Sequence, residues 1–117
     1  MTNFDKQVVA VLTDILPTYY ELFLKPTSKS PCISYQQIQN TETAGGNTIG
    51  VSEIRYRIKL WVTDVADGVE YEAEIDDALA TLHLHRTGYN ELTQNDLICK
   101  IYDYSGVAIE TYTTERT

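Results

Sequence analysis

The sequence predicts an α+β fold, with a mostly antiparallel sheet of about five strands and two helices in the order α-β-β-β-α-β-β. Apolar and polar residues alternate strictly from Glu53 to Val62, which indicates a central strand over 51–63. An apolar stripe of helical period predicts a helix over 69–82. Two short patterned segments, 84–92 and 97–103, are typical of a hairpin. Two helices on such a sheet bury one core.

Upstream of the central strand we expect one helix and two strands. An apolar face of period 3.6 predicts a helix over 3–16, with Asn3 as its N-cap and Pro17 after its end. The aromatic segment 18–24 and the segment 32–39 are predicted to be strands that pair as a hairpin. These elements complete the N-terminal half of the fold.

A long polar loop is predicted over 40–50, because this stretch contains three glycines and few apolar residues. Loops of this kind often carry contacts, so we expect this one to be disordered alone and ordered by a partner. Its candidate contact residues are Asn40, Gly45, Gly46 and Asn47.

The rest of the chain contains two turns and a tail. Turns are predicted at 64–68 and 93–96, and the Thr-rich tail 105–117 is expected to be a short strand or a loose arm. No repeat interrupts the chain, so residues 1–117 are interpreted as a single domain.

The stripe that should pack the second helix on the sheet consists of Tyr71, Ile75, Ala78, Leu79 and Leu82.

Composition restricts the classes of partner. Nine basic and 17 acidic residues give a net charge of −8, which disfavours phosphate backbones and anionic membranes and permits basic partners. It also permits a surface that DNA passes without being held. The sequence has neither an apolar run long enough to span a bilayer nor a signal-peptide pattern. Cys32 and Cys99 are interpreted as buried strand residues, with a disulfide left open, and the expected setting is a reducing cytoplasm.

Basic residues gather on one face of the central strand. Arg55, Arg57 and Lys59 alternate there, either as a solvated face or as ion-pair donors to an acidic neighbour, with nucleic acid as a weaker alternative. Trp61 shares this face and is expected either to lie under the first helix or to anchor a subunit interface. We take these four residues as the candidate interface.

Acidic residues gather on the second helix. Glu70, Glu74 and Asp77 lie on one edge, and Glu72 and Asp76 lie on the other edge of the apolar stripe. The first group is a candidate electronegative surface, with a solvated face and a divalent metal site as alternatives. An acidic edge and a basic strand face can pair head to tail between copies, and a head-to-tail contact that closes makes a ring.

No catalytic signature accompanies these patterns, so the sequence predicts neither an enzyme nor a cofactor. His83 and His85 have a spacing that can ligate Zn²⁺ or Cu²⁺, but the sequence places no third ligand, so no metal site is predicted. The rival hypothesis from the enzyme class is a metal-dependent hydrolase that uses this pair with the acids of the second helix.

Three segments resemble one known family. Tyr-Tyr-Glu-Leu (19–22), Pro-Cys-Ile-Ser-Tyr-Gln (31–36) and Ile-Arg-Tyr-Arg-Ile-Lys-Leu-Trp-Val (54–62) are similar to the tail completion or tail terminator proteins of long-tailed, siphovirus-like bacteriophages. The helix Ala73–Leu82 and the strand Tyr89-Asn90-Glu91-Leu92 fit the same layout, so the resemblance covers about residues 5–103. These motifs are packing patterns and carry no catalytic residue.

The resemblance implies a structural virion protein of the tail or neck, assembled in the host cytoplasm. Its subunits would form a hexameric ring that caps the tail tube and joins it to the head connector or stopper protein. The ring's lumen would pass DNA without specific binding; six copies at −8 each carry −48, which repels phosphates. The rival hypothesis from the binding class is another phage neck protein or an acidic module for a basic protein.

Overall fold

The computed structural model describes residues 3–20, 31–45, 49–94 and 96–111. The element order α-β-β-β-α-β-β and the α+β class are confirmed. In chain order the elements are α1 (Asn3–Thr13), β1 (Thr18–Tyr20), β2 (Cys32–Gly45), β3 (Ile49–Val62), α2 (Val65–Ala80), β4 (His85–Gln94) and β5 (Leu97–Thr111).

The five strands form one sheet in the order β1-β2-β3-β5-β4. All neighbours are antiparallel except β1 and β2, which run parallel with Thr18 opposite Ile33. The predicted hairpin between these two segments is therefore wrong. A tight turn joins antiparallel strands only, so the parallel direction of β1 and β2 excludes a hairpin. Residues 21–24 of the predicted first strand lie outside the described residues.

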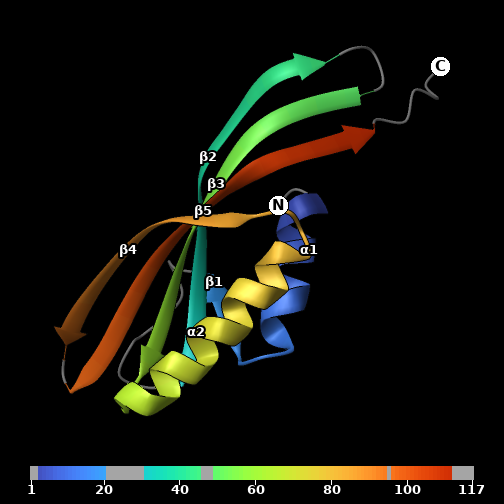
Figure 1. Ribbon diagram of the computed structural model, residues 1–117. Helices are drawn as coiled ribbons and strands as arrows, with labels where there is room; N and C mark the ends of the chain where they lie inside the picture. The colour runs from blue at the N-terminus through green and yellow to red at the C-terminus, as the bar shows by residue number, and fades with distance from the viewer. Residues whose placement is uncertain (1–2, 21–30, 46–48, 95, 112–117) are drawn as a thin grey trace.

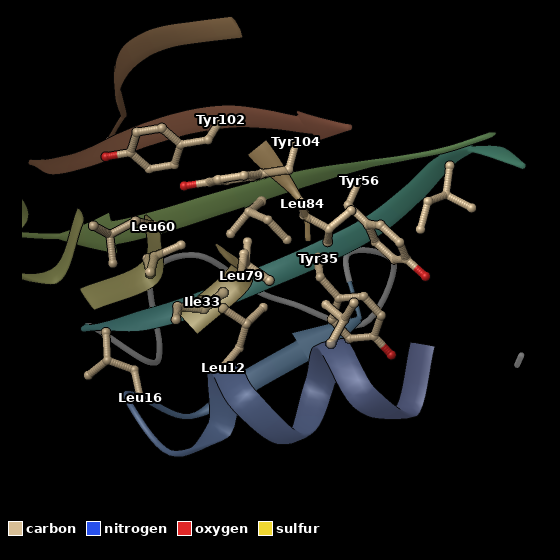
Figure 2. Close-up of a cluster of buried hydrophobic side chains, with 14 of the residues drawn as sticks. Leu12, Leu16, Ile33, Tyr35, Tyr56, Leu60, Leu79, Leu84, Tyr102 and Tyr104 are labelled. Carbon is tan, nitrogen blue, oxygen red and sulfur yellow. The ribbon is translucent and has the colours of Figure 1, made fainter. Parts of the chain in front are cut away.

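Both helices pack on one face of the sheet, and the core lies between the layers (Figures 1 and 2). The predicted alternation in β3 is confirmed, because its apolar set is 2% exposed or less while Glu53 and Arg55 on the other face are exposed. Leu12 and Leu16 reach the sheet from the α1 side, and Leu79 reaches it from α2. The inward residues of β3 are Ile54, Tyr56, Ile58, Leu60 and Val62.

The helix boundaries differ from the prediction at both helices. α1 ends at Thr13, and the backbone N–H groups of Ile15 and Leu16 bond the carbonyl of Leu12 in a closing turn. α2 begins at Val65, where a turn was predicted, because the Asp64 carboxylate accepts a hydrogen bond from the N–H of Ala66 at 2.7 Å.

Gly68 is a helical residue of α2 rather than a turn residue. A Cβ at this position would lie 3.0 Å from Cε of Lys100 and 3.4 Å from Cγ2 of Val62. The glycine therefore accommodates the close approach of the first turns of α2 to Val62 of β3 and Lys100 of β5.

Three strands continue beyond the part of the sheet that the helices cover, and we call this extension the arm. It consists of residues 41–45 of β2, 49–53 of β3 and 107–111 of β5, and Figure 1 shows it reaching clear of both helices. The predicted loop is thus wrong for Asn40 and Gly45, which lie in β2, while Gly46 and Asn47 lie outside the described residues. Of the two interpretations of the tail, the strand is confirmed as far as Thr111, where β5 ends.

Within the described residues, no helix has the length and apolarity that a membrane span requires.

Candidate functional site

The basic strand face predicted from the sequence lies on the side of the sheet opposite the helices. Arg57 is already paired within the chain: its Nε lies 3.0 Å from Oδ1 of Asp103, and its Nη2 lies 3.3 Å from Oδ2. Arg55 is exposed, and Lys59 is half-buried. The strand face therefore has less net positive charge than the sequence alone indicated, because Asp103 of β5 sits beside it.

An open groove of about 420 Å³ adjoins Arg57 on this face. Its walls combine two cations and one carboxylate with polar and apolar groups of β4 and β5. The lining residues are Arg57, Lys59, Gly88, Tyr89, Asn90, Ile101 and Asp103. Burial is incomplete around the groove, and Tyr89 is half-exposed. These properties suit a shallow contact surface better than a closed substrate pocket.

Trp61 is buried, and it does not lie under the first helix as one interpretation expected. It packs with Cys32, Leu97 and Cys99 on the face opposite α1, and its Nε1 donates to Oγ of Ser34 at 3.2 Å. Only 5% of the Trp61 side chain is exposed, so it has little surface with which to anchor a partner. Cys32 and Cys99 are free thiols, and burial raises the pKa of Cys32 to about 11.

The acids of α2 divide into two groups, as their spacing predicted. Glu70, Glu74 and Asp77 are exposed on the side of α2 that faces away from the sheet. Glu72 and Asp76 face β4 and β5 and are half-buried. The exposed acids and Arg55 thus lie on opposite sides of the sheet, which leaves the molecule with two faces of different charge.

Glu72 and Asp76 form a polar seam between α2 and the β4–β5 hairpin. Arg86 bridges them, with Nη1 at 3.2 Å from Oε2 of Glu72 and Nη2 at 3.3 Å from Oδ2 of Asp76. The hydroxyl of Tyr102 donates to Oε1 of Glu72 at 2.8 Å, and that of Tyr104 donates to Oδ1 of Asp76. Lys100 adds a weaker contact, with Nζ at 3.5 Å from Oε1 of Glu72.

The seam shifts the pKa values of its members in opposite directions. Burial alone would raise the pKa of Glu72, but the hydrogen bonds from Tyr102 and Arg86 and the nearby positive charges lower it below its usual value. Burial, followed by the hydrogen bond to a carboxylate, raises the pKa of Tyr102 and of Tyr104. The seam therefore holds an ionised Glu72 and neutral Tyr102 and Tyr104, which is a structural arrangement that fixes α2 on the sheet.

Sequence reasoning did not find this seam, although a signal for it exists. Lys100, Tyr102 and Tyr104 alternate on one face of β5, and Glu72 and Asp76 lie four residues apart on the helix edge above them. Polar groups at inward positions of a strand need partners, so the pattern predicts carboxylates on the facing helix.

The two histidines do not form a pair on one strand face. His83 precedes β4 with a φ of 61°, whereas His85 is the first residue of β4, and both are exposed. Within the described part of the chain, no three His, Cys, Asp or Glu side chains are grouped closely enough to hold a metal ion. These described residues therefore give the metal-dependent hydrolase hypothesis no candidate metal site.

Comparison with protein-family models and with curated proteins finds no match for the chain.

Proposed function

We propose that this chain is a structural virion subunit, a tail terminator that forms a ring at the end of a phage tail tube and joins it to the head connector. The observation that carries the proposal is the arm. In it, three strands extend past the helical layer, and among the described strands neither outer strand has a second neighbour there. Exposed strand edges are templates for pairing, and proteins keep them long mainly where a partner completes the sheet.

The charge distribution supports the same function. The chain carries −8, and three of its exposed acids lie on α2, away from the sheet. A ring of such subunits presents DNA with a surface that repels phosphates over most of its area. DNA can then slide through the lumen without being captured, which is what a conduit requires.

The ionic subunit contact predicted from the sequence becomes secondary in this proposal. Arg57 meets Asp103 of its own chain, so it is not reserved for an acid on a neighbour. Arg55 is the exposed member of the basic face, and its contact with a neighbouring subunit stays a prediction. We expect the arm, rather than the basic face, to supply most of the ring contact.

A cryo-EM reconstruction of the virion that carries this chain tests the proposal. We expect a closed ring of this subunit between the tail tube and the head connector. As an independent check, particles made without the chain should lack joined heads and tails, and purified protein added to the lysate should restore joining. A position elsewhere in the virion, or absence from it, would refute the function.

A further inference from the structure

Among the described strands, the outer strands of the arm have only one neighbour along most of their length. β1 pairs with β2 only from Ile33 to Tyr35, and β4 pairs with β5 only up to Ser105. Beyond these points β2 continues to Gly45 and β5 continues to Thr111, each with β3 as its one neighbour among the described strands. Alternate N–H and C=O groups on the outer sides of both strands are thus open to a further strand.

The residues along these edges do not discourage pairing. Edge strands are commonly protected by Lys, Pro, inward-pointing charges or bulges, and of these devices the β2 edge has two bulges. The edge segments 36–45 of β2 and 106–111 of β5 contain no Lys, Arg or Pro, and each has a single acid, Glu42 and Glu110. Val107, on the β5 edge, is 50% exposed although it is apolar. The composition is that of strands that accept a neighbour.

The directions of the two edges determine what kind of neighbour can satisfy both. β2 and β5 are each antiparallel to β3, so they run parallel to each other on opposite sides of the arm. A foreign strand would complete one edge and leave the other open. A second copy of this chain, placed in the same orientation, offers its β2 to β5 of the first and leaves its own β5 for a third.

We propose that β5 of one copy pairs in parallel with β2 of the next copy, so that the arms continue one sheet from subunit to subunit. The contact is heterologous, and repeating it with a constant rotation closes a ring. The inference rests on the proposed function for its product, a closed ring, but the pairing itself follows from the two open edges. It identifies the partner of the arm as another copy of the same chain.

Cysteine cross-linking between variants tests the pairing. Thr41 of β2 and Val107 of β5 both lie opposite Glu53, so their side chains share one face of the arm, and both are exposed. Two single variants, Thr41→Cys and Val107→Cys, are prepared so that their masses differ and their cross-linked products can be told apart. They are mixed, either at high concentration or with tail-tube ends, and treated with a short bismaleimide. The native thiols are buried, and the wild-type chain treated in the same way controls for them.

We expect the mixture to give a Thr41→Cys–Val107→Cys product, and each variant alone to give none. Thr93→Cys is the matched control, because Thr93 is exposed on β4 opposite Ile98, at the end of β5 that is away from the arm. Products from either variant alone would indicate two-fold pairing and would overturn the proposal. A product between Thr41→Cys and Thr93→Cys in place of Val107→Cys would overturn it as well, as would the absence of any product in both conditions.

A second variant separates pairing from folding. Val107→Lys places a charge on the open edge, and we expect it to lose association while keeping the wild-type melting temperature, whereas Thr93→Lys keeps both. Electron microscopy of the same wild-type sample distinguishes the two proposals. Rings without the β2–β5 product refute the pairing and leave the function standing. Cross-linked open filaments support the pairing and count against the ring function.

Discussion

The two ends of β3 lie in different surroundings, although they belong to one strand with one pattern. From Ile54 to Val62 its inward side chains are buried beneath α1 and α2. From Gly50 to Glu53 it is the middle strand of the arm, where its backbone is paired on both sides but no helix lies above it in Figure 1. The comparison teaches that most apolar burial lies in the covered part, while the arm has exposed surface that the proposed ring would use.

The largest expected effect comes from truncating a side chain in the covered part. Leu79 of α2 is fully buried against the sheet, so Leu79→Ala should lower the free energy of unfolding by about 2–5 kcal/mol. The matched change in the arm, Val107→Ala, should alter it by about 0.5 kcal/mol or less, because Val107 is half-exposed. Urea denaturation of both variants measures the difference. Equal losses would show that the arm contributes to the core as strongly as α2 does.

A smaller effect is expected at the polar seam. Tyr104→Phe removes the hydroxyl that donates to Asp76, which should cost about 1.5–3 kcal/mol because the acceptor is charged. Tyr89→Phe is the control, since Tyr89 is half-exposed and its hydroxyl bonds Glu91 on its own strand. Thermal unfolding at neutral pH compares the two variants, and a similar loss in both would show that the seam adds nothing to stability.

The seam also predicts how stability depends on pH. The folded-state pKa of Glu72 is lowered, so its contribution is present above the usual value of 4.5 and is lost as the pH falls through the folded value. The folded-state pKa values of Tyr102 and Tyr104 are raised, so their contribution is present below pH 10 and is lost as the pH rises beyond it. Denaturation midpoints should therefore fall at both extremes. In Glu72→Gln the acid loss should shrink, and an unchanged acid limb would contradict the assignment.

The smallest of these effects is expected where the arm leaves the covered part. A Cβ at Gly106 would lie 2.8 Å from the carbonyl oxygen of His83 and 2.8 Å from Cδ2 of Leu84. Gly106→Ala should therefore cost about 1–3 kcal/mol. At Gly88 the nearest atom would be 3.6 Å away, so Gly88→Ala should stay within about 0.5 kcal/mol of the wild type. Thermal unfolding of the two variants, followed by circular dichroism, measures the difference. Equal melting temperatures would contradict a steric clash at Gly106.

How far the sequence could predict this molecule depends on how local each signal is. The alternation in β3, the hairpin of β4 and β5 and the stripe with Ile75 and Leu79 are local patterns, and the structure confirms them. The prediction of a loop over residues 40–45 was wrong. These residues are polar in composition, but they form a strand by pairing with β3, which lies later in the chain. The prediction of a turn at Gly68 was wrong because the sequence does not distinguish a glycine at a close helix–sheet contact from a glycine in a turn.

The candidate site followed the same rule. The separation of Glu70, Glu74 and Asp77 from Glu72 and Asp76 followed from helical spacing alone. The partner of Arg57 could not be predicted from local spacing, because Asp103 is brought beside Arg57 only by the register of β3 against β5. The burial of Trp61 likewise depends on neighbours from β2 and β5.

The two β-bulges of β2 have a consequence for the chain before it assembles. The register shifts once between Gln37 and Gln39 and once between Glu42 and Ala44, so Ile38 and Thr43 have no partner on β3. Fibrils grow by stacking flat, regular strands, and a bulged edge is a poor template for them. The edge of β2 is thus irregular enough to disfavour amyloid-like stacking, and in the ring that we propose the neighbouring strand would have to match the bulges.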